Sequence, residues 1–211
     1  MAHKKLPLFP LGIIVYPFES LHLHVFEPRY RQLTKECEEQ GITFGIPPFI
    51  DDKLQKFGTE LKLVEVVNRY ENGRMDIKCR GLRVFQIHDF INPMEEKLYA
   101  GGKVEFQDLK DDASVSDKIL FLEKVNQMFS LMEIEHQYTA ENHFLAYKLA
   151  HQVGLSSSQE YQLLSISTEK KRIEFLIDHL TRAIPMLTEV EKTKKRINMN
   201  GHFKYFNPLN F

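Results

Sequence analysis

The chain has 211 residues, which is enough for one domain with a sizeable core or for two small domains. Its 28 lysines and arginines nearly balance its 29 aspartates and glutamates, which argues against tight, salt-dependent binding to nucleic acid or to an anionic membrane. Hydrophobic residues make up 43% and charged residues 27%, so the composition excludes a disordered chain. The two cysteines, Cys37 and Cys79, are too few for a disulfide framework or a thiolate metal site.

The first residues, "MAHKKLPLFPLGIIVYPFE", begin with positive charge followed by apolar residues, as a signal peptide does. Pro7, Pro10 and Pro17 would break the helix that a signal peptide needs, and no cleavage site of small residues follows. No apolar run approaches the roughly 20 residues of a membrane span. We therefore expect a cytoplasmic protein without a membrane partner.

Residues 1–108 have the composition of strands. The runs "GIIVYP", "LHLHVF" and "ITFGI" are β-branched or alternate between apolar and polar residues, and loops with proline separate them. One helix is expected among them over residues 28–40, because Pro28 suits a first helical position and Gly41 suits the left-handed position after the last.

A hairpin is predicted over residues 59–90. Asn72-Gly73 is typical of a type I′ turn, and the apolar residues after it alternate with charged ones, which gives the hairpin one dry face. Further on, Gly101 and Gly102 indicate a bulge or a sharp bend where the sheet curls. The first half is therefore expected to be a mostly antiparallel sheet that is closed or nearly closed.

The second half, residues 109–198, follows a polar and acidic connection at residues 107–117 and has helical periodicity. Its four helices are expected to begin at Ser114, Thr139, Ser156 and Ser167 or Thr168, with the second ending at Gly154. Pro185 should kink the long fourth helix, although the apolar stripe continues beyond it. Residues 199–211 form an aromatic tail. The pattern predicts an α+β fold, in which a β-rich pseudobarrel with one short helix precedes a four-helix bundle.

Three stretches of the sequence carry a resemblance to a known family. They are "LPLFPLGIIVYPFESLHLHVFEPRYRQL", "FGTELKLVEVV" with "NGRMDIKCRGLRVFQI", and "GLSSSQEYQLLSISTEKKRIEFLIDHL". Together they resemble the N-terminal, substrate-binding domain of Lon-type ATP-dependent proteases, over most of residues 5–190. The resemblance implies a PUA-like pseudobarrel followed by a helical bundle, and a role in holding unfolded or tagged polypeptide.

The sequence departs from the full protease in one large respect. No G-x-x-x-x-G-K-[ST] phosphate loop occurs, and the serine–lysine protease domain of that family is not in the chain. We therefore expect a stand-alone, non-catalytic module without a cofactor. Its partners would be extended polypeptide or another protein, and its role that of an adaptor or regulator in protein quality control.

Two other functions stay open as alternatives. RNA binding, which PUA-like barrels also support, would need a basic face with aromatic residues, and the near-neutral charge argues against it. An enzyme would need paired titratable groups in a pocket. The nearest acidic clusters are Asp111-Asp112 in the connection and Asp51-Asp52 in a loop, and both are expected to be solvated.

The motif "FEPRYR" has a functional and a structural interpretation. Arg29 and Arg31 suit the pairing of acidic groups on a substrate. Alternatively, Glu27 at a helix N-terminus, Pro28 in the first turn and a buried Tyr30 make the motif a corner of the fold. We favour the corner.

Histidines and cysteines give no clear site. His22 and His24 share one face of a strand and could hold a metal, but no third ligand follows at a recognisable spacing. His143 and His151, two helical turns apart, are no better candidates for a metal site. Both cysteines are expected to be inert, since one lies on an apolar strand face and the other at an acidic helix end.

The candidate binding residues are apolar side chains in loops and in the tail. They are Tyr16, Phe18, Pro47, Pro48, Phe49, Ile50, Phe203, Tyr205, Phe206 and Phe211. The loop residues either fold back over the barrel mouth, which we favour, or form a patch for extended peptide. The tail either docks on its own domain, which we favour, or recruits a partner or a second copy in a homo-oligomer.

Overall fold

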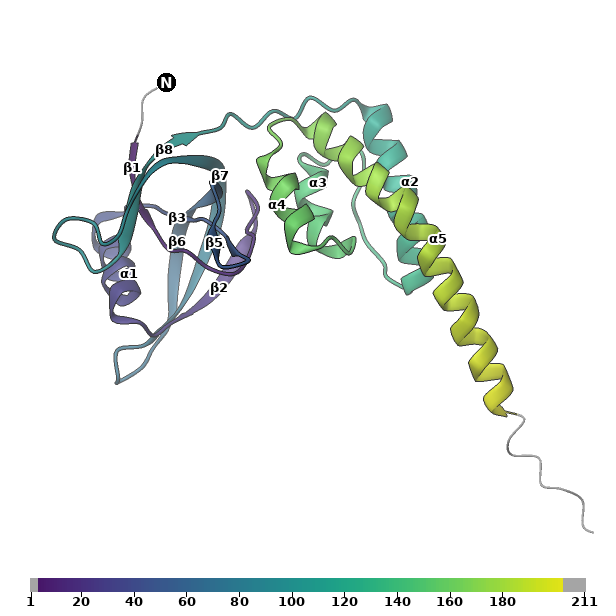
Figure 1. The fold of residues 1–211 in the computed structure, drawn as a ribbon, viewed down its shortest axis with the longest axis horizontal. Helices are drawn as coiled ribbons and strands as arrows, with labels where there is room; N and C mark the ends of the chain where they lie inside the picture. The colour runs from purple at the N-terminus through teal and green to yellow at the C-terminus, as the bar shows by residue number, and fades with distance from the viewer. Residues whose placement is uncertain (1–3, 203–211) are drawn as a thin grey trace, which may run out of the picture.

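The computed structural model describes residues 4–202, with side chains described up to residue 197. Figure 1 shows a curled sheet joined by an extended connection to a group of helices, the last of which projects away from the rest. The chain therefore has a strand-rich half followed by a helical half, in the order that the sequence predicts.

Most of the strands form one closed sheet. The described strands are β1 (Lys4–Leu8), β2 (Ser20–Val25), β3 (Phe44–Ile46), β4 (Phe49–Ile50), β5 (Lys53–Leu54), β6 (Phe57–Arg69), β7 (Met75–Ile91) and β8 (Ala100–Phe106). The main sheet has the order β2-β7-β6-β3-β1-β8, and β7 also pairs with β8, so the sheet closes on itself and leaves β2 outside the ring. Only β1 and β3 pair in parallel, which confirms the prediction of a mostly antiparallel, closed sheet.

Strand β7 closes the ring because its two ends pair with different neighbours: the first part pairs with β2 and the last part with β8. At Gly101 and Gly102, where a bend or bulge is predicted, backbones approach closely. A β-carbon on Gly102 would lie 2.4 Å from the carbonyl oxygen of Asp89. The register shift itself lies opposite, on β7, between Ile87 and Asp89.

The turn between β6 and β7 differs from the prediction. A type I′ turn needs positive φ at both central residues, whereas Asn72 has none and Gly73 has a φ of 77°. The Gly73 amide donates to the Tyr70 carbonyl at 2.8 Å, and the Tyr70 amide donates to the Arg74 carbonyl at 2.9 Å. The chain therefore makes a type I turn that ends in a left-handed glycine, the usual three-residue hairpin loop.

Helix α1 (Pro28–Gln40) is the predicted helix of the first half. Pro28 occupies its first turn, and Gly41 follows its end in the left-handed conformation, with a φ of 66°. Tyr30, Leu33 and Cys37 are buried and pack into a core cluster with the apolar residues of β7. This apolar face holds α1 against the sheet.

The helical half contains α2 (Val115–Met132), α3 (Leu145–Leu149), the 3-10 helix η1 (Ala150–Gln152), α4 (Ser157–Ser165) and α5 (Glu169–His202). The capping boxes predicted from Ser114 and Ser156 are both present. The second helix begins at Leu145 and not at Thr139, because Phe144 adopts a left-handed conformation, with a φ of 52°, which a helix cannot include.

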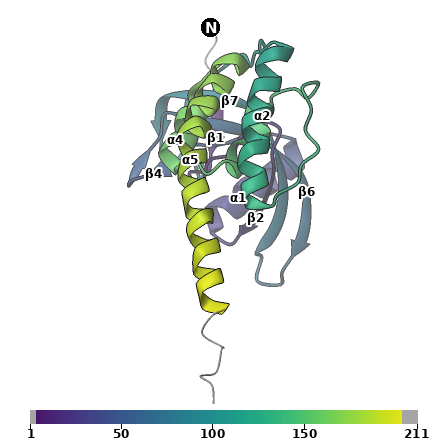
Figure 2. The ribbon, with the colours of Figure 1, turned by 90° about the vertical axis from the view of Figure 1, so that its right-hand side faces the viewer.

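Helices α2 and α5 are long and pack on each other, whereas α3 and α4 are short. Pro185 lies inside α5 without ending it. Figures 1 and 2 show the C-terminal part of α5 extending beyond the other elements, and Met186, Val190 and Ile197 are exposed there. No helix among the described residues is both long enough and apolar enough to cross a membrane.

The two halves share buried side chains. Ile14 and Tyr16, from the loop between β1 and β2, and Val84 of β7 belong to the same core cluster as the buried residues of α2 to α5. The helical half therefore packs directly on the strand-rich half. The loop that leads into β2 lies at this junction.

Candidate functional site

Tyr16 joins the two halves and does not line a surface. Its side chain is 1% exposed, its hydroxyl donates to the carbonyl oxygen of Glu160 at 3.1 Å, and its ring stacks on Tyr147. Burial raises the pKa of its hydroxyl far above the usual range. Tyr16 must therefore be removed from the candidate binding residues, because the loop folds back and buries it.

His151 lies between carboxylates from both halves. Its Nδ1 is 2.7 Å from Glu160 of α4, and its Nε2 is 3.3 Å from Glu19 of the loop before β2. The hydrogen bond to Glu19 outweighs the effect of burial and, with that to Glu160, raises the pKa of His151 to about 9. The imidazole is therefore charged at neutral pH and bridges the junction.

A small cleft opens beside this bridge. It has a volume of about 240 Å³ and is lined by Pro17, Phe18, Glu19, Tyr138, Tyr147, Lys148, His151 and Gln152. Phe18 is 38% exposed, has a positive φ of 70°, and its ring lies 5.0 Å from that of Phe144. Phe18 is thus a predicted residue that lines a cleft, with aromatic walls and the cations Lys148 and His151 close by.

The loop prolines are buried, contrary to a role in an exposed patch. The carbonyls of Pro47 and Pro48 accept the amides of Leu11 and Gln55, at 3.4 and 2.9 Å. Ile50 is half-buried against the helical core. Phe49 is 45% exposed on the small β4–β5 hairpin.

The predicted tail residues lie outside the described part of the chain. They are Phe203, Tyr205, Phe206 and Phe211. Their role, in docking or in recruiting a partner, stays a prediction.

Strand β2 is the open edge of the sheet, since it pairs with β7 and with no other described strand. The bonds around β7 show which way its backbone groups point. The Tyr70 amide donates to the Arg74 carbonyl on the β6 side, and the Gly81 amide donates to the Glu19 carbonyl, at 2.9 Å, on the β2 side. Because bonding alternates along an antiparallel strand, even-numbered residues face β6 and odd-numbered ones face β2 over residues 75–80, the part of β7 that pairs with β2.

The free backbone groups of β2 follow from this alternation. Leu21 pairs with Cys79 and Leu23 with Ile77, so these β2 residues bond to β7. Ser20, His22 and His24 then turn their N–H and C=O groups away from the sheet, and their side chains are exposed. An unpaired row of this kind is a template for another strand.

Aromatic and polar side chains gather where β2 ends. Asp76 accepts hydrogen bonds from Tyr70 at 2.6 Å and Asn68 at 3.1 Å, and its other oxygen lies 2.6 Å from the His24 ring. These bonds, chiefly that from Tyr70, hold the pKa of Asp76 at about 2. Phe26, which is 57% exposed, has its ring 6.1 Å from that of His24.

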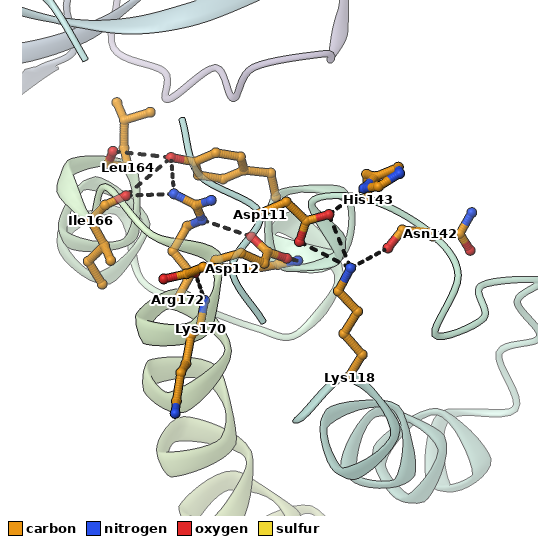
Figure 3. Close-up of polar contacts among 12 residues, drawn as sticks. Asp111, Asp112, Lys118, Asn142, His143, Leu164, Ile166, Lys170 and Arg172 are labelled. Atoms are coloured by element: carbon orange, nitrogen blue, oxygen red, sulfur yellow. Dashed lines mark hydrogen bonds and ion pairs between the residues drawn. The ribbon is translucent and has the colours of Figure 1, made fainter. Parts of the chain in front are cut away.

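A polar network, buried at Lys118 and exposed at His143 and Asp112, holds the connection between the halves against the helices (Figure 3). Asp111 contacts His143 and lies 3.0 Å from the Lys118 amine, while Asp112 accepts the Lys170 amide at 2.9 Å. Burial opposes the ionisation of Asp111, but the bonds from His143 and Lys118 prevail and lower its pKa. The expectation that Asp111 is solvated is wrong, because the connection folds onto the helices.

The deepest part of this network is an ion pair inside the helical half. Glu169 and Arg172 are both 0% exposed, and their Oε2 and Nε atoms are 3.0 Å apart. Arg172 also donates to the Tyr147 hydroxyl at 3.2 Å and to the Ile166 carbonyl at 2.7 Å. These charged groups bind one another, as a structural network does, and the enzyme interpretation gains no open pocket from them.

Comparison with known proteins identifies the family. The family model of the ATP-dependent protease La (LON) substrate-binding domain matches residues 5–182. The chain belongs to the Lon substrate-binding domain family. A comparison with curated proteins gave no match.

Two solved structures share the fold of this Lon-type chain. The Lon N-terminal domain protein from Xanthomonas campestris is 23% identical, with a TM-score of 0.66, and the match covers 83% of this chain and 98% of that one. The N-terminal domain of Mycobacterium avium complex Lon protease is 18% identical, with a TM-score of 0.62, and the match covers 84% and 98%.

In this member of the Lon family, the "FEPRYR" motif is largely a corner of the fold. Arg29 pairs with Glu27 at 2.9 Å and lies over the ring of Tyr30, which is buried and stacks on Phe9. Arg31 is the exception, because its guanidinium group takes no part in these contacts and points into a separate cleft.

The cysteines and histidines of the Lon-type domain show no reactive or metal-binding arrangement in its described part. Burial raises the pKa of both thiols, Cys37 and Cys79, to about 12, so thiolate is scarce at neutral pH. No group of three histidine, cysteine or acidic side chains that could hold a metal occurs among residues 4–197.

Sequence reasoning missed the bridge at His151. Its partner Glu19 is 132 positions away, and no local spacing links the two residues. It also missed the free edge of β2, which depends on the order of strands in the closed sheet.

Proposed function

We propose that this Lon-type domain binds extended polypeptide by strand addition to the outer edge of β2, with an apolar side chain of the ligand held beside Phe18. The observation that carries the proposal is the row of outward-facing backbone groups at Ser20, His22 and His24. This row begins two residues after Phe18, so the edge starts close in the chain to a residue that lines the junction cleft.

The composition of β2 supports this use of the edge. Natural edge strands are usually protected by lysine, proline, inward charges or a covering element. The sequence of β2, "SLHLHV", contains no lysine, proline or acid, and β2 pairs with β7 alone among the described strands. An edge without these protections is suited to pairing with another chain.

Strand addition also suits a ligand without a fixed sequence. Main-chain hydrogen bonds give affinity whatever the side chains are, while a few pockets read alternate side chains. The family description, a substrate-binding domain, agrees with such a ligand. We expect modest affinity, because ordering a flexible chain offsets several kcal/mol of the contact energy.

The test uses a membrane-bound array of short peptides cut from an unfolded model protein, followed by fluorescence anisotropy with the strongest binder. His22→Pro removes an outward N–H that no ladder bond uses, so the fold should persist while peptide binding is lost. Phe18→Ala should weaken binding about tenfold, as loss of an aromatic anchor does.

The matched control is Phe90→Ala. Phe90 lies at the far end of β7 and is 39% exposed, against 38% for Phe18, so a general effect of removing an exposed ring would appear in both variants. Unchanged peptide binding by a folded His22→Pro protein would contradict strand addition at β2. Salt-dependent retention of the protein on an RNA column would instead favour nucleic acid as the ligand.

We further propose that this binding serves protein quality control, with the domain acting as an adaptor or regulator in the cytoplasm. The support is the family match and the exposed edge with its aromatic anchor. In this role the domain supplies recognition, and any cleavage is done by a partner.

A further inference from the structure

A cleft between α1 and the β6–β7 hairpin holds an arginine, Arg31, whose side chain has no partner among the described residues. The cleft has a volume of about 660 Å³, and Arg31 and Lys35 of α1 line it opposite Arg69 of β6. It lies on a different side of α1 from the buried residues that face the core.

The acidic residues of this cleft are already paired. One guanidinium nitrogen of Arg69 lies 2.5 Å from both carboxylate oxygens of Glu38, and the Lys35 amine is 3.7 Å from Glu39. No hydrogen bond or ion pair reaches the Arg31 guanidinium from any residue that the structure describes. The three cations therefore face two carboxylates, and the excess positive charge is that of Arg31.

The hairpin turn leaves room for this guanidinium. Gly73 lies directly beneath it, and a β-carbon on Gly73 would be 2.2 Å from an Arg31 Nη atom. Arg31 is half-buried. A half-buried guanidinium has lost part of its water and binds a planar oxyanion more strongly than a fully exposed one does.

We propose that the cleft binds a carboxylate of a polypeptide ligand through Arg31. Guanidinium and carboxylate form two parallel hydrogen bonds, which suits the planar fork of arginine. Met75, which lines the cleft, pairs with Val25 at the end of β2, so a chain added along β2 reaches this region. The inference rests on the proposed function for its ligand, but the site can be tested without a peptide.

The direct test is a titration of the whole chain with glutarate, followed through the side-chain N–H resonances of arginine. Arg74 is the internal control, because it is exposed, lies next to Gly73, and its side chain also has no partner among the described residues. We expect the Arg31 resonance to shift in a saturable way at concentrations that leave Arg74 unchanged. Equal, non-saturating shifts of both would overturn the site.

The second test measures selectivity for charge in bound peptides. A pair of otherwise identical peptides is compared, one with aspartate or glutamate and one with the corresponding amide, each with a free or an amidated C-terminus. Arg31→Gln should remove a preference of about tenfold for the acidic form, while Arg74→Gln leaves it intact. Comparing the free with the amidated C-terminus distinguishes binding of a side-chain carboxylate from binding of the terminal carboxylate.

The two proposals fail in distinguishable ways. If peptides bind wild-type protein but ignore the acid-to-amide change, the carboxylate site is wrong and strand addition stands. If His22→Pro leaves peptide binding intact while glutarate still shifts Arg31, strand addition is wrong and the site stands. Arg31→Gln should not lower the melting temperature, and a large drop would assign Arg31 a purely structural role.

Discussion

Two of the places where charged groups join parts of this molecule differ in their access to water. At the junction, His151 is 39% exposed and lies between Glu19 and Glu160. Inside the helical half, Glu169 and Arg172 are 0% exposed and bind each other. If a contact at the junction breaks, water can hydrate the His151 ring. Water cannot reach the Glu169–Arg172 pair in the same way.

This difference separates two kinds of stabilisation. Removing one member of a buried pair leaves a charge without a partner or water, which is far more costly than the pair itself is worth. Partly exposed pairs contribute little, because water and salt replace the lost partner. We therefore expect the helical half to behave as a rigid unit, and the junction near Phe18 to adjust more easily.

The largest expected effect is on the buried pair. Glu169→Ala leaves the buried Arg172 guanidinium without its carboxylate, and we expect it to lower the free energy of unfolding by about 3–5 kcal/mol. Chemical denaturation of the purified chain measures this. The control is Glu174→Ala, on the exposed face of the same helix, which should change stability by less than about 0.5 kcal/mol. If the two variants lost similar amounts of unfolding free energy, burial of the charge would not explain the effect of Glu169→Ala.

A smaller effect on the free energy of unfolding is expected at Tyr16, an uncharged and buried residue of the junction. Tyr16→Phe keeps the packed ring but removes the hydroxyl that binds the Glu160 carbonyl, and should cost about 1 kcal/mol. Tyr70→Phe, which removes an exposed hydroxyl bound to Asp76, should cost less. If Tyr16→Phe is as stable as wild type, the hydrogen bond does not help to hold the halves together.

Features set by neighbours in the sequence could be predicted closely. Pro28 and Gly41 define the ends of α1, and Ser114 and Ser156 begin α2 and α4, because caps act within a few residues. The start of α3 was missed, since the left-handed Phe144 carries no signal that distinguishes it from a helical residue.

Features set by distant contacts could not be predicted. Tyr16 follows an apolar run and precedes proline, so the local sequence predicts a loop residue. In the structure the helical half covers it. Asp111 lies in an acidic run that reads as solvated, but Lys118 and His143 pair with it once the connection has folded. For the same reason the sequence could not show that Arg31 lacks a partner among the described residues, because this depends on which acids its neighbours bind.

The smallest expected effect concerns the pH dependence of the junction. The pKa of His151 is raised from 6.5 to about 9 in the folded chain, so the folded state binds a proton more tightly than the unfolded state does. Its contribution to stability is therefore fully present below about pH 6.5, and is lost as the pH rises towards 9. Because the ring is 39% exposed, we expect this contribution to stay below about 1 kcal/mol.

A comparison of wild type with His151→Gln across this pH range measures the effect. The difference in unfolding free energy between the two proteins should be largest near pH 6 and shrink towards pH 9, and added salt should reduce it. Adjustment at the junction predicts that peptide binding beside Phe18 changes over the same pH range. A difference in stability that is constant with pH would show that the charge of His151 does not hold the halves together, and the contrast with the buried pair would then rest on Tyr16 alone.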